Sequence, residues 1–162
     1  FDRWIKSDVG YCYINWFDNT LAAYMGEQPA LCSMRTYCPC SLAVEHNGDV
    51  YSCDHFVYPD YRLGNLTDES LIEMVKSDRQ LYFEQNKQAS LSSRCRGCDY
   101  LFACGGDCPK NRIQITPEGD SISTLCGGFK MYFEHTRRYF EYMAYELKNN
   151  RPPANVMKVK LG

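Results

Sequence analysis

Ten cysteines are the residues of this 162-residue chain whose number and spacing offer the most specific chemistry. They are Cys12, Cys32, Cys38, Cys40, Cys53, Cys95, Cys98, Cys104, Cys108 and Cys126. Disulfide bonds would suit a small secreted domain, but a chain of this length can bury a core, and its first residues do not resemble a secretion signal. Reduced thiols that bind metal fit the spacing better.

The densest run is Cys95-x2-Cys98-x5-Cys104-x3-Cys108, with a proline next and Cys126 after a gap. An iron-sulfur cube needs four thiolates that converge from different directions, and close pairs in loops with one remote ligand can supply them. In bacterial ferredoxins, a run that ends x3-Cys-Pro sends its last cysteine to the other cluster. We therefore expect Cys95, Cys98, Cys104 and Cys126 to hold one 4Fe-4S cluster and Cys108 to serve a second.

The ligands that would join Cys108 at the second cluster must come from the earlier half of the chain. That half offers one cysteine more than the three required, namely Cys32, Cys38, Cys40 and Cys53. Zinc is the main alternative to iron, because Cys-x2-Cys pairs also build zinc ribbons, which would make the chain a structural or binding module. A stand-alone, ferredoxin-like electron carrier is the other alternative.

The segment around Asn47 and Gly48 predicts a β-hairpin that would position Cys53. Residues 42–45 and 50–53 have the composition of short strands, and the Asn-Gly pair between them tolerates the positive φ angles of a tight turn. Residues 26–40 combine two prolines with three cysteines, which favours a loop. We expect the second strand to end at Cys53.

Apolar residues at helical spacing predict a helix over residues 7–25, a short helix from residue 71 with an irregular continuation to about 87, and a helix over 129–149. Ser7 or Asp8 would cap the first of them. Residues 92–128 place several glycines close to cysteines, which favours a loop whose backbone can approach a bulky inorganic group. We expect the tyrosines of the last helix to pack in a core that covers the metal region.

Composition and charge exclude several classes of function. The formal net charge is -2 and no basic block is present, so we expect no nucleic-acid partner. No apolar run approaches the roughly 20 residues that cross a bilayer, so we expect no membrane and a cytoplasmic location. We expect His46, His55 and His135 to be ordinary surface or core residues, because the cysteines suffice as ligands.

The complete cysteine pattern resembles the seven-cysteine SPASM domain of radical S-adenosylmethionine (SAM) enzymes. Cys38-x9-Gly48-x4-Cys53, the dense run and Cys126 match all seven positions. Within that group, four stretches resemble the anaerobic sulfatase-maturating enzymes: SDVG at 7–10, GDVYSCDH at 48–55, YLFAC at 100–104 and CPKNR at 108–112. The resemblance implies an α+β fold, an irregular cysteine-rich SPASM-type domain with a β-hairpin, two auxiliary 4Fe-4S cluster sites and flanking helices.

The resemblance also assigns ligands to the two clusters. Auxiliary cluster I would take Cys32, Cys38, Cys53 and Cys108, and auxiliary cluster II would take Cys95, Cys98, Cys104 and Cys126. Cys12 and Cys40 would be spare, although Cys40 lies close enough to Cys38 in sequence to be the alternative ligand.

Asp54 is the catalytic base that the resemblance implies, since the family places an acidic residue directly after the third ligand. A cube with four thiolates carries net negative charge, so a neighbouring carboxylate should hold its proton more tightly than free aspartate. That change would improve its match to proton transfer near neutral pH. Without the resemblance, Asp54 is an aspartate at the end of a strand.

The resemblance implies a reaction in which a Cys or Ser of a sulfatase is oxidised to formylglycine. A 5'-deoxyadenosyl radical takes a β-hydrogen, a proton leaves the heteroatom and one electron departs. The implied partners are the sulfatase polypeptide and an external electron donor such as a flavodoxin or ferredoxin. Other SPASM enzymes crosslink or cyclise peptides, and the cysteine pattern is compatible with them.

The chain contains no Cys-x3-Cys-x2-Cys motif for a SAM-binding cluster and opens without Met. We therefore expect a third 4Fe-4S cluster and SAM to lie in an upstream radical SAM barrel, and this portion alone to be inactive. On this plan residues 1–26 end the upstream region, residues 27–128 form the SPASM domain, and residues 129–162 form a C-terminal helix and tail.

Overall fold

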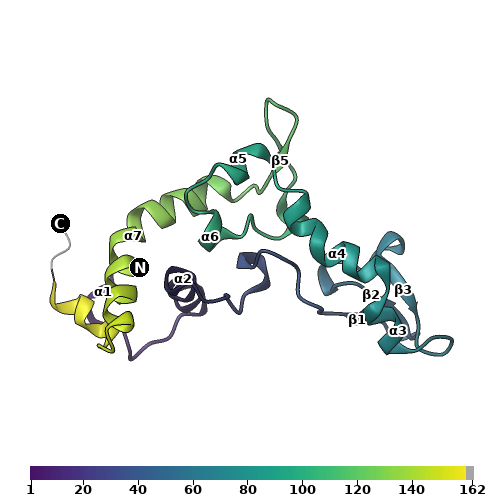
Figure 1. The fold of residues 1–162 in the computed structure, drawn as a ribbon, viewed down its shortest axis with the longest axis horizontal. Coiled ribbons are helices and arrows are strands. Elements are labelled where there is room, and N and C mark those ends of the chain that lie inside the picture. The colour runs from purple at the N-terminus through teal and green to yellow at the C-terminus, as the bar shows by residue number, and fades with distance from the viewer. Residues whose placement is uncertain (160–162) are drawn as a thin grey trace. The chain divides into compact units, whose positions relative to one another are not determined.

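The computed structural model describes residues 1–159, and these fall into two units that are best considered separately (Figure 1). Unit 1 contains residues 1–35, 98–105 and those from 125 onward. Unit 2 contains residues 36–97 and 106–124. Among the described residues, no helix combines the length and the apolar character that crossing a membrane requires.

Unit 1 is built mainly from helices. They are α1 (Trp4–Ser7), α2 (Asn15–Met25), α6 (Leu101–Cys104) and α7 (Cys126–Lys148), with 3-10 turns at Cys32–Met34 and Pro153–Lys158. Its main core joins buried residues of α1, α2, α7 and the last turn: Trp4, Ile5, Val9, Phe17, Phe140, Met143 and Val156. Aromatic rings dominate this core, and Phe140 has no exposed surface.

Two helix boundaries in unit 1 differ from the sequence-based prediction. The helix predicted over residues 7–25 is wrong in its first half, because residues 8–14 form turns and α2 begins only at Asn15. Gly10 adopts a left-handed φ of +85° there, which an α-helix cannot accommodate. The last helix begins at Cys126, so Gly127 and Gly128 lie inside its first turn and not in a loop.

Unit 2 contains two small antiparallel sheets. The first has the order β1 (Ala43–Val44), β2 (Asp49–Tyr51) and β3 (Arg62–Asn65). The turn between β1 and β2 carries Gly48 at φ +85°, which confirms the predicted Asn-Gly hairpin. The second sheet pairs β4 (Gln114–Ile115) with β5 (Ser121–Ile122), within the predicted loop.

The helices of unit 2 are short. They are α3 (Leu71–Lys76), α4 (Asp78–Ala89) and α5 (Ser93–Arg96), with 3-10 turns at Asp54–Phe56, Pro59–Tyr61 and Pro109–Asn111. The short helix predicted from residue 71, with its irregular continuation to about 87, is instead two helices divided at Ser77, whose hydroxyl accepts a hydrogen bond from the Gln80 amide at 3.2 Å and caps α4. Short helices with small antiparallel sheets confirm the α+β class.

Candidate metal centre

Three of the predicted ligands gather in unit 2. Cys108 is buried together with Phe56 and Phe83, and Cys38 and Cys53 pack against this group. The Phe56 and Phe83 ring centroids lie 5.3 Å apart in an edge-on arrangement, so the sulfurs adjoin an apolar floor. Residues separated by up to 70 positions are thus brought together at one place.

Each of these cysteines is fixed through its backbone. The Cys38 amide donates to the Glu84 carbonyl of α4 at 3.1 Å. Cys53 follows β2 and forms an isolated bridge with Ser41. The Cys108 amide donates to the Asp107 side chain at 2.7 Å. These contacts fix the backbone of each cysteine.

The electrostatics of this group suit a bound cation or cluster. Burial raises the pKa of the Cys53 thiol to about 12, and the Asp54 carboxylate and then the Cys108 sulfur add to the shift. A thiolate here therefore needs positive charge to form, and iron or zinc supplies it because coordination deprotonates the thiol. The donor set fits an iron-sulfur cluster, whose ligands are cysteine thiolates.

The other predicted ligands are divided between the units. Unit 2 also holds Cys95, whose amide is capped by the Ser92 hydroxyl at 3.1 Å at the start of α5. Unit 1 holds Cys32, Cys98, Cys104 and Cys126. Each predicted set of four therefore draws residues from both units, and each unit by itself shows part of each set.

In unit 1, Cys104 ends α6 and packs against buried Ala103 and Phe133. Cys126 is the first residue of α7, three residues before Phe129, which packs in the same cluster as Cys104. Cys32 opens a 3-10 turn and is exposed. The two cysteines predicted to be spare, Cys12 and Cys40, are also exposed.

Asp54 lies directly beside the centre. The Cys53 thiol donates to its carboxylate at 3.2 Å, and this bond is the largest cause of a lowered Asp54 pKa. This direction is opposite to the raised pKa expected from the sequence, because that expectation concerns a cluster-bound Cys53 thiolate, which donates no such hydrogen bond. The carboxylate is exposed, which leaves it accessible to a substrate.

His55 is a site residue that sequence reasoning set aside. Its Nδ1 lies 3.6 Å from the Cys108 sulfur, and its Nε2 lies 4.0 Å from a carboxylate oxygen of Asp54. One potential ligand atom from each of Cys53, Asp54 and His55 falls within 4.8 Å of the others. The position of His55 directly after Asp54 in the sequence was the signal that could have identified it as a candidate site residue. The other histidines lie near acidic surface residues, His46 beside Glu45 and His135 beside Asp2.

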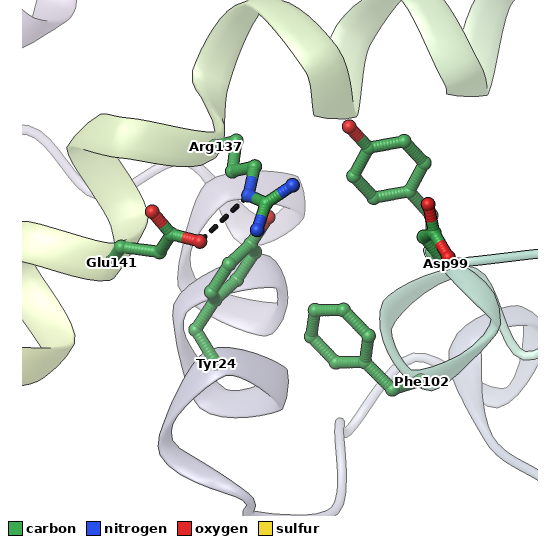
Figure 2. Close-up of a pocket in the computed structure, with 6 residues that line it drawn as sticks. Tyr24, Asp99, Phe102, Arg137 and Glu141 are labelled. Carbon is green, nitrogen blue, oxygen red and sulfur yellow. Dashed lines mark hydrogen bonds and ion pairs between the residues drawn. The ribbon is translucent and has the colours of Figure 1, made fainter.

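Unit 1 also contains a hollow of about 380 Å³ beside α6, shown in Figure 2. It is lined by Tyr24, Asp99, Tyr100, Phe102, Arg137 and Glu141. Arg137 Nε donates to Glu141 Oε1 at 2.7 Å, and the buried Tyr24 hydroxyl has no hydrogen-bond partner among the described residues. Burial raises the Tyr24 pKa to about 12. No cysteine lines the hollow, so its lining offers no thiolate for iron.

Comparison with known proteins agrees with this chemistry. Residues 32–99 match the SPASM family, an iron-sulfur cluster-binding domain. The chain is 50% identical over 159 residues to a serine-type anaerobic sulfatase-maturating enzyme of Bacteroides thetaiotaomicron, a match that covers 98% of this chain and 38% of the relative. It is 28% identical to a cysteine-type anaerobic sulfatase-maturating enzyme of Clostridium novyi, covering 89% of this chain and 39% of the relative.

A solved structure has the same fold. The structure of anSMEcpe with bound AdoMet superposes with a TM-score of 0.77 at 25% identity, covering 98% of this chain and 41% of that protein. The chain thus spans about two-fifths of the length of the relatives that it matches. Residues 32–99 thus match an iron-sulfur cluster-binding SPASM domain, and the chain is similar over nearly its whole length to anaerobic sulfatase-maturating enzymes.

Proposed function

We propose that this chain is the auxiliary-cluster portion of a radical SAM enzyme that oxidises a Cys or Ser of a sulfatase to formylglycine. The observation that carries the proposal is the gathering of Cys38, Cys53 and Cys108 on one apolar floor with Asp54 beside them. The 50% identity to a serine-type sulfatase-maturating enzyme supports it. Because cysteine-type relatives match less closely, a serine target is the first to test.

Eight cysteines would hold two 4Fe-4S clusters in this chain. We assign Cys32, Cys38, Cys53 and Cys108 to one, and Cys95, Cys98, Cys104 and Cys126 to the other. Bound clusters would supply a one-electron acceptor. The chain's own residues would fix the sulfurs through their backbones and keep water away from Cys108, which is 8% exposed.

Asp54 is the proposed catalytic base. Its exposed carboxylate would accept the proton that leaves the sulfur or oxygen of the target residue, as the β-carbon loses a hydrogen atom and the substrate loses one electron. A base is effective only if its proton affinity suits near-neutral pH. The negative charge of neighbouring thiolates and cluster would raise that affinity.

The remaining parts of the activity would lie outside this chain. We propose that a third 4Fe-4S cluster and SAM occupy an upstream barrel, which residues 1–26 would continue, and that a flavodoxin or ferredoxin exchanges electrons with the enzyme in the cytoplasm. The peptide-bound and AdoMet-bound structures of anSMEcpe support the substrate class and the cofactor. Residues 27–128 would then be the SPASM domain and 129–162 its C-terminal helix and tail.

The test has two readouts. Anaerobic reconstitution of this chain should yield brown protein with broad visible absorption and about eight iron atoms per chain, as expected for two 4Fe-4S clusters. Joined to the radical SAM region, it should convert a sulfatase peptide to formylglycine in the presence of SAM and reductant, as measured by mass spectrometry. Colourless protein with two zinc ions would favour a structural module, and crosslinked or cyclised peptide would favour another SPASM chemistry.

A further inference from the structure

Arg112 is a buried cation in unit 2 that the proposed function does not use. It is 7% exposed, and its guanidinium is held by oxygens of the chain. Nε donates to the Gly106 carbonyl at 2.8 Å, one terminal nitrogen to the Lys87 carbonyl at 2.7 Å and the Ser90 hydroxyl at 3.2 Å, and the other to the Asp107 carbonyl at 3.1 Å. These bonds fix both its position and its orientation.

The charge of Arg112 has no direct partner of opposite sign. No carboxylate within residues 1–159 forms an ion pair with it. The oxygens of the neighbouring Asp107 carboxylate accept instead from the Cys108 amide at 2.7 Å, Asn111 at 3.0 Å and Ser123 at 2.7 Å. A buried charge that makes only neutral hydrogen bonds is costly, so a nearby negative group is expected to balance it.

Cysteine side chains are among the groups whose negative charge would act on Arg112. Burial lowers the Arg112 pKa, and Cys95 opposes that shift most strongly, followed by Asp107, Cys38 and Cys108. Cys95 belongs to one proposed ligand set, and Cys38 and Cys108 belong to the other. The chain also links the guanidinium to these ligands, because Asp107 accepts from Arg112 through its carbonyl and from the Cys108 amide through its carboxylate.

We propose that Arg112 is a positioning residue whose buried charge balances thiolates of both cysteine sets and raises the reduction potentials of the clusters that they hold. The inference rests on the proposed iron-sulfur function. A cation stabilises the reduced cluster, which carries one more negative charge, more than the oxidised cluster. A single residue would therefore tune both electron-transfer centres.

The first test is a pair of substitutions in the anaerobically reconstituted protein, with midpoint potentials measured by EPR-monitored redox titration. Arg112→Gln keeps hydrogen-bond donors but removes the charge, and should shift the reduction equilibrium of each cluster roughly tenfold toward the oxidised form, or about 59 mV for a one-electron couple. Arg112→Lys keeps the charge and should keep the potentials near wild type. Arg94→Gln is the matched control, because Arg94 adjoins Cys95 in sequence but is exposed and therefore screened.

A second pair leaves Arg112 in place. Ser90 is exposed, and its hydroxyl accepts from the guanidinium. Ser90→Asp would give Arg112 the carboxylate partner that it lacks and should lower the potentials, whereas Ser90→Asn has the same size without charge and should not. This pair decides the question if Arg112→Gln fails to assemble its clusters.

The outcomes separate this inference from the proposed function. Wild-type potentials in an iron-loaded Arg112→Gln protein, or equal potentials in Ser90→Asp and Ser90→Asn, would overturn the role of Arg112 and leave the function standing. Equal loss of stability in Arg112→Gln and Arg112→Lys with unchanged potentials would show a purely structural arginine. Wild-type protein that assembles no iron-sulfur cluster would overturn both proposals.

Discussion

The two units obtain their order from different sources. Unit 1 packs aromatic rings of α1, α2 and α7 into a core, as in the Phe17 and Tyr132 stack with centroids 6.1 Å apart. Unit 2 has strands of two to four residues and a small apolar group that includes the Cys108 sulfur. Packing alone can hold the first unit, whereas the second places thiols where a metal would complete its core. Unit 1 also supplies proposed ligands, so iron should contribute to the order of both units but more to unit 2, which has the smaller apolar core.

Removal of iron should therefore produce the largest effect, and unit 2 should lose more of its order than unit 1. Chelation of the reconstituted protein, or Cys53→Ser, should open residues 36–97 and 106–124 to limited proteolysis, because metal binding supplies folding free energy. Helix α7 should stay protected. Cleavage mapped by mass spectrometry gives the result, and Cys12→Ser is the control because Cys12 is exposed and outside both ligand sets. Equal cleavage of both units would break the comparison.

Asp54→Asn should abolish chemistry without disturbing either unit. Loss of a general base lowers turnover by about 100- to 10,000-fold. Formylglycine formation is the measurement, with iron content and thermal stability expected to match wild type because Asp54 is exposed. Asp60→Asn is the matched control, since Asp60 is exposed on the following 3-10 turn of the same unit. Normal turnover in Asp54→Asn would refute the assignment.

Phe140→Ala, in contrast to Asp54→Asn, should lower stability, and it should do so in unit 1 alone. The ring is fully buried, and truncation of such a ring costs about 3–5 kcal/mol of unfolding free energy. Denaturant unfolding of the iron-loaded protein measures the loss, and Met131→Ala, 68% exposed on the same helix, should change it little. Iron content should stay at the wild-type level. A proportional loss of iron in Phe140→Ala would show that the two units are not independently ordered.

The smallest expected effect is a dependence of sheet stability on pH. Hydrogen bonds from Arg62 and then Asn65 lower the Asp49 pKa to about 2. Since this folded-state pKa is below the unfolded value of about 4, the contribution is complete above pH 4 and is lost as the pH falls toward 2. Asp49→Asn should remove this component from the acid unfolding curve of metal-free protein. An unchanged curve would show that the Arg62 bond, 2.7 Å long, contributes nothing measurable.

Local signals made some elements predictable. The Asn47-Gly48 pair was enough to predict the β1–β2 hairpin, because Gly48 readily adopts the positive φ that the turn needs. β3 was missed because Arg62–Asn65 carries Gly64 and has no alternating pattern, and it is held as a strand by pairing with β2 across a register shift. Ser77 was missed as a cap because residues up to about 87 were expected to be an irregular continuation of the short helix from residue 71 and not a second helix.

The candidate site also has features that the sequence predicted and features that depend on tertiary packing. Cysteine spacing predicted which residues could bind iron, because both the residue type and the short spacing that a metal site needs can be seen in the sequence. That Cys38, Cys53 and Cys108 adjoin Phe56 and Phe83 depends on packing between distant segments, which spacing does not encode. The position of His55 beside the Cys108 sulfur also depends on that packing.

The turn before Cys108 limits how this domain can be re-engineered. Gly106 adopts φ +72° and Asp107 φ +60°, and a β-carbon added to Gly106 would lie 2.3 Å from the Leu91 side chain and 3.0 Å from the Arg112 guanidinium. Leu91 therefore packs closely against Gly106 and Arg112, although it lies 15 residues before Gly106 in the sequence. Transfer of the cysteine run alone into another protein should supply the ligands without the backbone conformation that positions them. Such a transfer would also need Leu91, Gly106 and Arg112.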